Sequence, residues 1–332
     1  MSQNQTLPPR VACLIVTYNR ADFVVECINS LLREDGEHQS IEITVTNNGA
    51  LDETAEVLEA IDDPRVTVRT KETNQILNSV LNECLEIGHA SGADYLLLLN
   101  DDIEMKPGAV TEMVSVCNEH PMSIVNPLQI NYRRPDEIDS GQLKLLQNTP
   151  GLLDDALLQG APQRSYPQRT MIGAAMLAKA ETFKAVGDFD PIFPFYGLDD
   201  DYSNRSWDMG VPLRIAMRAH MLHMHGKTTA EAAQKQSKED WLRRWSSHYR
   251  ARAIFRIKDP KNPLLPTYIK VVSKVFFDIP LFLAKTFPGG VKVAARTFVF
   301  LVSHYGQIAR RREIENRRAE EFKVKQGKAD PS

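Results

Sequence analysis

Short apolar runs alternate with longer segments of helical periodicity through the first hundred residues. The apolar runs predict strands over residues 11–17, 41–46, 66–69 and 95–99. Between them, apolar side chains recur three or four residues apart, which predicts helices beginning near residues 22, 52 and 75. Because strand and helix alternate, we expect a doubly wound α/β sheet.

The pattern becomes less regular after residue 123. Further strands are predicted at 124–130 and 171–177, and a short helix at 180–186 that Gly187 ends. Residues 132–169 are rich in Pro, Gly, Gln and Asp and show little periodicity. They predict a long functional loop or lid, or a partly disordered insert. Residues 212–225 read as an extended segment that ends in histidines.

Polar side chains follow three of the predicted strands where each strand ends. They are Thr17, Tyr18 and Asn19 after the first strand, Asn47 and Asn48 after the second, and Asn100, Asp101 and Asp102 after the fourth. In such sheets, ligands bind beyond the carboxyl ends of the strands. Adjacent carboxylates repel each other and are costly to bury, so Asp101 and Asp102 call for a positive partner. Hard oxygen ligands suit Mg²⁺ or Mn²⁺, which bring phosphate with them. The alternative is an Asn-Asp turn that caps the next element.

A second acidic cluster stands at Asp199, Asp200 and Asp201, just after several aromatic residues. A helix N-terminus favours such charges, which is the structural explanation. An Asp beside other carboxylates also has a raised pKa, which suits a general base near neutral pH. Further on, His223 and His225 share one face if their segment is a strand, and each is a candidate metal ligand.

Charge divides the chain into an acidic body and a basic tail. Residues 1–240 hold 20 Lys and Arg against 36 Asp and Glu, whereas residues 241–332 hold 20 against 7. Residues 267–287 are as long as a membrane span, but Lys270, Lys274, Asp278 and Pro280 interrupt them. This favours a helix lying on an anionic membrane surface. The alternative is a helical bundle packed on the N-terminal α/β domain or on a second subunit of a homo-oligomer. Nucleic acid is not an expected partner, because no base-stacking aromatic platform accompanies the charge.

The four cysteines, Cys13, Cys27, Cys84 and Cys117, show no metal-ligand spacing and predict reduced thiols. The first ten residues are polar and lack the apolar core of a signal peptide. Together with the basic tail, these features predict a cytoplasmic protein that is peripheral on the inner face of the cell membrane.

Several motifs in order resemble the family-2 glycosyltransferases, which have the GT-A fold. They run from VTYNR at residues 16–20 through TNNGALDET at 46–54, LLLLNDDIE at 96–104 and IGAAML at 172–177 to GDFDPIFPFYGLDDDYSNR at 187–205 and HMHG at 223–226. The spacing is most similar to bacterial rhamnosyl- and galactofuranosyltransferases of cell-surface glycan synthesis. The resemblance implies a GT-A catalytic domain with a doubly wound mixed sheet over residues 8–232, and a basic, amphipathic helical extension over residues 233–332.

The resemblance also implies a role for each polar cluster. The nucleotide pocket would be lined by Thr17, Tyr18, Asn19, Asn47, Asn48, Asn78, Asn100 and Asp101. Asp102 would be the principal metal ligand, with Asp101, His223 and His225 as further candidates. Two positions depart from the family's pattern, since Asn47 and Leu198 stand where acidic residues are usual. This leaves either Asp199 or Asp200 as the base that deprotonates the acceptor.

The implied activity is inverting, metal-dependent transfer of a sugar from a UDP- or dTDP-sugar to a glycan acceptor, lipid-linked if the tail lies on a membrane. One displacement needs no activated Ser or Cys. Two alternatives remain: a nucleotidyltransferase, disfavoured because the 17–20 turn lacks the glycine of a phosphate loop, and an inactive protein that binds nucleotide sugars.

Overall fold

The computed structural model describes residues 7–36, 38–152, 155, 162–193, 196–224, 238–286 and 290–327. The chain forms two compact units. Unit 1 comprises Met1–Phe189 and Ser206–Gly226, and unit 2 comprises Asp190–Arg205 and Lys227–Ser332. Residues 190–205, which carry the Asp199–Asp201 cluster, therefore fold with the C-terminal helices.

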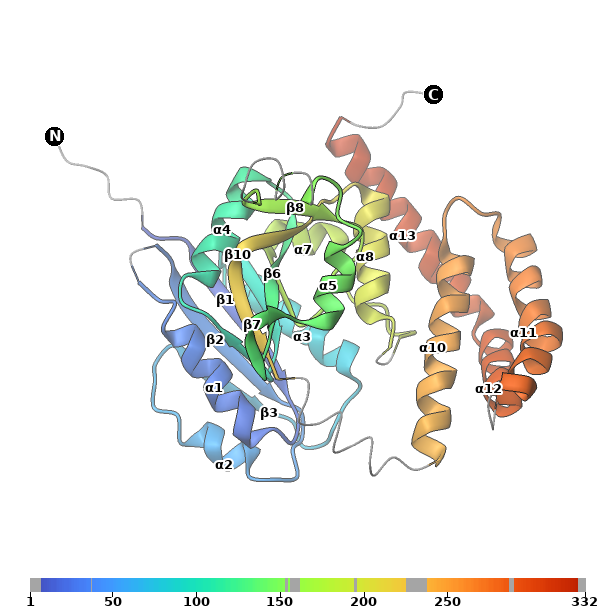
Figure 1. Ribbon diagram of the computed structural model, residues 1–332, viewed down its shortest axis with the longest axis horizontal. Coiled ribbons are helices and arrows are strands. Elements are labelled where there is room, and N and C mark those ends of the chain that lie inside the picture. The colour runs from blue at the N-terminus through green and yellow to red at the C-terminus, as the bar shows by residue number, and fades with distance from the viewer. Residues whose placement is uncertain are drawn as a thin grey trace. The chain divides into compact units, whose positions relative to one another are not determined.

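Unit 1 is built on a mixed sheet, and ten strands belong to it within the described residues. Its main path runs β3-β2-β1-β4-β9-β6-β10-β5, with β7 paired to β6 and β8 to β10 (Figure 1). The strands are β1 (Arg10–Thr17), β2 (Ser40–Asn47), β3 (Val66–Thr70), β4 (Tyr95–Asn100), β5 (Ile103–Met105), β6 (Ile124–Asn131), β7 (Arg134–Ile138), β8 (Ser165–Gln168), β9 (Ala175–Lys179) and β10 (Leu213–His223). Strands β3, β2, β1 and β4 are parallel, as the alternating pattern predicts.

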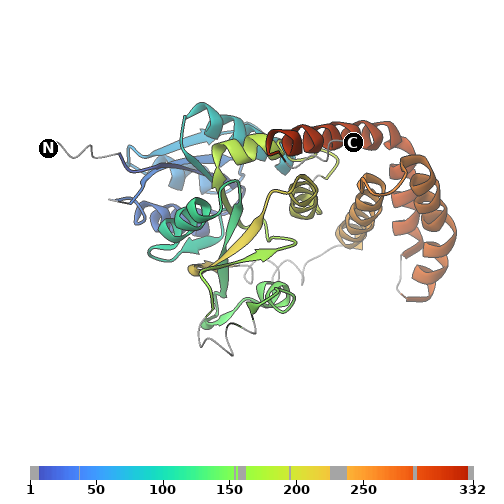
Figure 2. The same ribbon diagram turned by 90° about the horizontal axis from the view of Figure 1, so that it is seen from above.

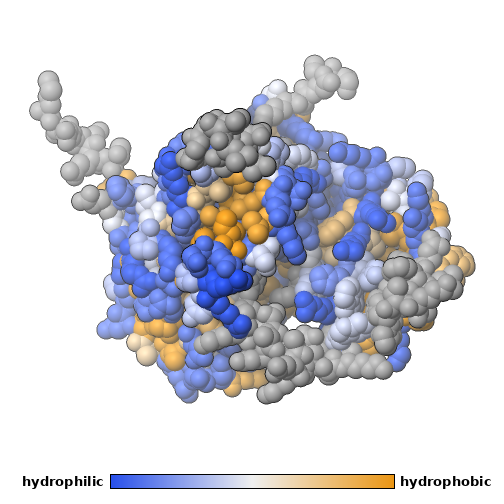
Figure 3. All heavy atoms as spheres, viewed as in Figure 1, coloured by the Kyte–Doolittle hydropathy of each residue, from blue (hydrophilic) through white to orange (hydrophobic). Residues whose placement is uncertain are grey.

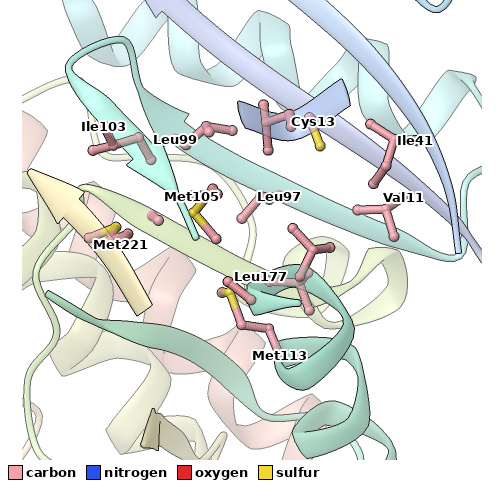
Figure 4. Packing of buried hydrophobic residues seen from close by; sticks show 14 of the residues in the cluster. Val11, Cys13, Ile41, Leu97, Leu99, Ile103, Met105, Met113, Leu177 and Met221 are labelled. Carbon is pink, nitrogen blue, oxygen red and sulfur yellow. The ribbon is translucent and has the colours of Figure 1, made fainter. Parts of the chain in front are cut away.

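Helices cover this sheet because alternate side chains of each strand need an apolar partner. Among the helices that contact it are α1 (Ala21–Leu32), α2 (Thr54–Glu59), α3 (Leu77–Ala90), α4 (Ala109–Glu119) and α7 (Ala180–Val186). One core cluster joins α1, α2 and α4 to side chains from one face of β1, β2 and β4, including Val11, Cys13, Ile41, Leu97 and Leu99 (Figure 4). Burial on this scale holds the strand ends in fixed register.

The prediction of a long loop over residues 132–169 was wrong. Instead of one long loop, the described part of this segment contains β7, a helix α5 (Ser140–Leu146) and β8. Strand β7 is almost wholly exposed, so its pairing with β6 leaves no apolar alternation in the sequence. Asp139 begins α5 by accepting hydrogen bonds from two backbone amides. The predicted strand at 171–177 also begins later, at Ala175, because β9 pairs with β4 only from there.

Unit 2 is helical over its described residues. It contains the first turns of α8 (Leu198–Met209), α10 (Lys238–Lys258), α11 (Leu264–Thr286), α12 (Gly290–Ser303) and α13 (Tyr305–Lys325). Helices α10, α11 and α12 contact one another and appear as the orange helices in Figures 1 and 2. Ile254, Ile257, Val275 and Leu301 of these helices and Ile308 of α13 are fully or almost fully buried in one cluster. None of the helices in the described part of the chain has the length and apolarity needed to cross a membrane.

Candidate donor site and catalytic carboxylates

The register of the parallel strands brings the predicted polar residues together. Thr17 at the end of β1 pairs with Asn47 at the end of β2, and Val16 pairs with Asn100 at the end of β4. The Asn48 amide donates to the Thr17 carbonyl at 2.8 Å, so the chain stays close to β1 after β2 ends. Three turns that are far apart in sequence therefore meet at one edge of the sheet, as expected for a ligand site.

Asn47 and Asn48 shape one side of this edge. The side chain of Asn48 donates to Asn74 Oδ1 at 2.9 Å and accepts from the Gln75 amide at 3.0 Å, which fixes the segment before α3. Asn47 is fully buried, and its Oδ1 accepts from the Ala50 amide at 3.0 Å. Its Nδ2 has no hydrogen-bond partner among the described residues. A buried donor without a partner is costly, and a ligand acceptor would satisfy it.

Asp101 is held in an environment that disfavours its charge. Burial, with a smaller contribution from the charge of Asp102, raises the pKa of the Asp101 carboxyl to about 6. The Thr17 hydroxyl and Arg20 lie near enough to oppose this shift. Among the described residues, the Thr17 hydroxyl has no partner that meets the distance and angle of a hydrogen bond. Asp101 is therefore the carboxyl that gains most from a cation or a donor group of a ligand.

Asp102 lies between two side chains of different elements. Its Oδ1 is 3.2 Å from His223 Nε2, and its Oδ2 is 3.5 Å from Arg20 Nη1. Strand β5 brings this about, since Ile103 pairs with His223 and the Met224 amide donates to the Asp102 carbonyl at 2.8 Å. The other ring nitrogen of His223 is 3.2 Å from Gln129 Oε1, which orients the imidazole.

This pair fits a divalent cation. Adjacent ligands of an octahedral Mg²⁺ at about 2.1 Å stand roughly 3 Å apart, and the Asp102 oxygen and His223 nitrogen are separated by 3.2 Å. Asp101 does not join them in a three-ligand cluster. Two protein ligands leave coordination positions for phosphate oxygens, which is how Mg²⁺ is commonly bound at phosphate sites. The predicted candidate His225 lies outside the described residues.

Within the described residues, three carboxylates approach one another closely at Asp190, Asp201 and Glu315 in unit 2. Cations of the protein already neutralise them. Lys258 Nζ is 2.7 Å from Asp190, 2.6 Å from Asp201 and 2.8 Å from Glu315, and Arg205 Nε is 2.9 Å from Asp201. Lys258 and Arg205 lower the pKa of Asp201 against the opposing effect of burial. This group is a buried ion-pair network, and Asp201 belongs to it.

Asp199 and Asp200 lie in the same first turn of α8 but outside that network. Gly197 begins the turn with φ +90°, and a Cβ there would come within 2.8 Å of the Ala251 methyl on α10. Burial and the neighbouring charges of Asp199 and Asp201 raise the pKa of Asp200, although its side chain keeps access to solvent. Arg252 opposes this shift. A solvent-accessible carboxylate with a raised pKa suits a general base.

The structure thus gathers Thr17, Asn47, Asn48, Asp101, Asp102 and His223 around one edge of the unit 1 sheet. Asn19 reaches that edge too, since it accepts from the Leu51 amide at 2.7 Å. Tyr18 is half-buried beside it, and Asn78 is buried in the first turn of α3. Asn100 is exposed at the end of β4. Arg20 and Gln129 were not predicted. The available signals were a cation next to the first turn, and a polar residue within an apolar strand.

Solved structures place this architecture in a class. The chain resembles the mannosyltransferase PcManGT from Pyrobaculum calidifontis, solved with GDP-Man and Mn²⁺, with a TM-score of 0.54 and 15% identity over 92% of this chain and 88% of that one. It also resembles GalNAc-T7, solved with UDP, GalNAc and Mn²⁺, with a TM-score of 0.55 and 15% identity over 67% of this chain and 44% of that one. The protein has the GT-A fold.

Sequence comparison finds a family match over part of the chain. Residues 12–162, slightly less than half of the chain, match the model of glycosyl transferase family 2. A curated relative, the succinoglycan biosynthesis protein ExoO of Rhizobium meliloti (strain 1021), is 29% identical over 106 residues, which are 32% of this chain and 29% of that protein. Over these residues the chain is similar to the family-2 glycosyltransferases. It spans less than a third of the length of the curated relative it matches.

Proposed function

We propose that this protein is an inverting, metal-dependent glycosyltransferase. It moves a sugar from a UDP- or dTDP-sugar to a lipid-linked glycan in bacterial cell-surface polysaccharide synthesis. The observation that carries the proposal is the placement of Asp102 between His223 and Arg20 at the carboxyl ends of the strands. Supporting it are the match of residues 12–162 to glycosyl transferase family 2, the similarity to the succinoglycan biosynthesis protein ExoO, and the GDP-Man, UDP and Mn²⁺ bound in the two structurally similar proteins.

Asp102 and His223 would hold Mg²⁺ or Mn²⁺, while Arg20 adds a fixed positive charge beside Asp102. When bound, the cation supplies charge neutralisation for the departing diphosphate. The buried Nδ2 of Asn47 would donate a hydrogen bond to the nucleotide. Asn47 is therefore the residue that we propose recognises the base. Tyr18, Asn48 and Asn78 complete the proposed pocket.

The acceptor needs a carboxylate that can take its proton as its oxygen attacks. Asp199 and Asp200 are the candidates, because Asp201 is committed to its ion pairs with Lys258 and Arg205. General-base assistance is worth about 10²–10⁴ in rate. A single displacement inverts the anomeric centre and needs no covalent intermediate.

A thermal-shift screen tests the donor half of the proposal. We expect UDP- or dTDP-sugars to raise the melting temperature of the full chain in the presence of Mn²⁺, because a ligand that binds only the folded state stabilises it. Asp102→Ala should abolish this shift and also the metal-dependent hydrolysis of the donor. The exposed Asp136 on β7 provides the matched control, as Asp136→Ala should leave both intact. If no nucleotide sugar produces a metal-dependent shift, the proposed function is wrong.

We also propose that unit 2 binds an anionic membrane from the cytoplasmic side. Exposed apolar side chains gather on α11 and α12, near the right-hand edge in Figure 3: Leu265, Ile269, Phe276, Phe277, Val291, Val299 and Val302, each more than half exposed. Lys270, Lys274 and Lys292 lie on the same two helices. Val275 on α11 is instead buried in the unit 2 core, so only part of the apolar surface of α11 is exposed. The combination of exposed aromatic residues and basic charge supports an interfacial surface.

Flotation with vesicles tests the membrane proposal. The full chain should float with phosphatidylglycerol-containing vesicles and much less with phosphatidylcholine alone. Phe276→Asp with Phe277→Asp should reduce flotation, whereas Leu51→Asp, at an exposed apolar residue of unit 1, should not. Recovery of the wild-type protein entirely in the bottom fraction would contradict the membrane assignment.

A further inference from the structure

A cavity of about 370 Å³ lies along one stripe of α10 in unit 2. It is lined by Trp241, Arg244, Trp245, His248, Tyr249 and Arg252. These positions recur every three or four residues, so they share one face of the helix. Ile254, on the opposite face of the helix, is buried in the unit 2 core. Trp241 and Tyr249 pack partly buried against a smaller cluster around Leu242 and Val293, whereas Arg244 and Trp245 are exposed.

The cavity combines aromatic faces with positive charge. Trp245 lies 6.0 Å from Trp241 and 6.4 Å from Tyr249, measured between ring centroids. Arg244 and Arg252 are exposed, and neither forms an ion pair with a carboxylate that the structure describes. Burial and these two guanidinium groups lower the pKa of His248, which therefore adds no charge of its own at neutral pH. Flat aromatic faces suit the C–H face of a sugar ring, and guanidinium groups suit phosphate.

The cavity adjoins the proposed catalytic carboxylates within the same unit. The Tyr196 ring lies 4.3 Å from the His248 ring, and the Arg244 guanidinium is 5.7 Å from the centre of Tyr196. Tyr196 stands immediately before Gly197, whose left-handed turn leads into the start of α8. Arg252 acts electrostatically on Asp200. A ligand in the cavity thus lies beside the turn that carries Asp199 and Asp200.

We propose that this cavity is the acceptor subsite and that it takes a saccharide bearing a phosphoryl group, with the sugar ring on Trp245 and Trp241 and the phosphoryl oxygens on Arg244 and Arg252. The proposal rests on the proposed function, because it names the substrate class of the acceptor side. The volume of the cavity lies within the range of small-molecule sites, which is about 300–1,000 Å³. A sugar joined to a lipid carrier through phosphate is one source of this chemistry, and a free sugar phosphate is another.

The three tryptophans make the site directly observable by NMR of their indole N–H groups. Two of them, Trp241 and Trp245, line the cavity, and Trp207 near the end of α8 does not. Titration of the full chain with α-D-glucose 1-phosphate should shift the Trp241 and Trp245 signals saturably and leave Trp207 unchanged. Glucose and inorganic phosphate, each lacking one half of the ligand, should bind at least roughly tenfold more weakly, since a charge-assisted hydrogen bond is worth about one factor of ten or more.

Substitutions then distinguish binding in the cavity from non-specific attraction of the ligand to positive charge on the helix. Arg244→Ala and Trp245→Ala should each weaken glucose 1-phosphate binding about tenfold, whereas Arg256→Ala, an exposed arginine of the same helix outside the cavity, should not. Equal binding of inorganic phosphate would reduce the cavity to an anion site and overturn the proposal. Failure of all three probes to shift Trp241 and Trp245 would overturn it too.

Two further arms separate the sources of the ligand and the two proposals. Vesicles containing phosphatidylglycerol are added to compete with glucose 1-phosphate for the cavity. If they bind the Trp245→Ala variant as well as they bind the wild-type chain, the cavity is a lipid headgroup site, and the saccharide assignment is overturned. Donor binding is scored separately, by the Mn²⁺-dependent thermal shift and its loss in Asp102→Ala. A normal donor shift with silent tryptophans removes only the acceptor subsite. Responsive tryptophans without a donor shift remove the proposed function, and the cavity is then a sugar-phosphate site with no acceptor role.

Discussion

Replacing Lys258 with Met should destabilise unit 2 strongly. The ammonium group touches Asp190, Asp201 and Glu315 at 2.6 to 2.8 Å, and the side chains of the first two are almost fully buried. Arg205 and Arg311 are the other described cations of the network. Three carboxylates therefore face three cations, and removing Lys258 leaves one buried negative charge without compensation.

The size of the effect follows from that uncompensated charge. Removing one partner of a buried ion pair typically costs about 3–5 kcal/mol of unfolding free energy. With a urea dependence of about 2 kcal/mol per M, the midpoint should fall by roughly 1.5–2.5 M. The loss should be smaller at pH 5.5 than at pH 8, because a buried carboxyl without Lys258 can take up a proton at the lower pH. Burial and Asp201 already raise the pKa of Glu315, so it is the group that we expect to be protonated first.

In the wild-type protein, the stability that Lys258 contributes depends on pH in a different way. The neighbouring carboxylates raise the pKa of Lys258 above its ordinary value despite burial. A lysine whose folded pKa exceeds its unfolded pKa contributes stability that is fully present below the unfolded value and is lost as the pH rises through the folded value. The contribution of Lys258 is therefore complete at neutral pH and declines only in strongly alkaline solution.

Tryptophan fluorescence during urea unfolding measures this, because Trp241 and Trp245 both lie on α10 of unit 2. Lys261→Met removes an exposed lysine a few residues away and serves as the control. Adding Glu315→Gln to Lys258→Met should recover part of the loss, since it removes the excess charge. If Lys258→Met unfolds within about 0.5 kcal/mol of the control, the network does not carry the stability assigned to it.

Three further predictions concern the proposed site. Asp199→Asn or Asp200→Asn should lower the sugar-transfer rate about 10²–10⁴-fold and spare donor binding; normal turnover in both variants would exclude the turn as the base. If Asp200 is the base, its raised pKa places the acidic limb of the kcat profile above the ordinary range of Asp, and Arg252→Gln should move that limb to higher pH because Arg252 opposes the shift; an unmoved limb would count against Asp200. Gly49→Ala should cost more than about 1 kcal/mol of unfolding free energy, because Gly49 has φ +72° and a Cβ would meet the backbone of the segment before α3, whereas Gly36→Ala, in open space, should cost little.

Much of unit 1 could be predicted because its signals are local. Each run such as Leu96 to Leu99 is apolar on both faces, which only a strand covered by helices explains. The positions of Asn47, Asp101 and Asp102 followed from the rule that parallel strands end at one edge. The mixed character of the sheet was harder to predict. The antiparallel strand β9 lies between β4 and β6, and nothing in the sequence of residues 175–179 indicates which strands it pairs with.

The partners of the charged residues could not be predicted in the same way. Asp201 and Lys258 are 57 residues apart, and no local pattern links the two positions. The same holds for Asp102 and His223, whose contact depends on the antiparallel pairing of β5 with β10. The acidic triplet at 199–201 looked uniform in sequence. The fold divides it, because Asp201 pairs with the buried Arg205 of α8 and Lys258 of α10, whereas Asp200 keeps access to solvent.

The sequence by itself determined where strands end in polar groups and which residue types stand there, because side-chain periodicity and turn chemistry act over a few residues. Tertiary structure alone decided which of those groups meet, which are neutralised and which stay accessible. Charge and hydrogen bonding act between atoms a few ångströms apart, and only the folded chain brings Asp102 to His223 and Lys258 to Asp201.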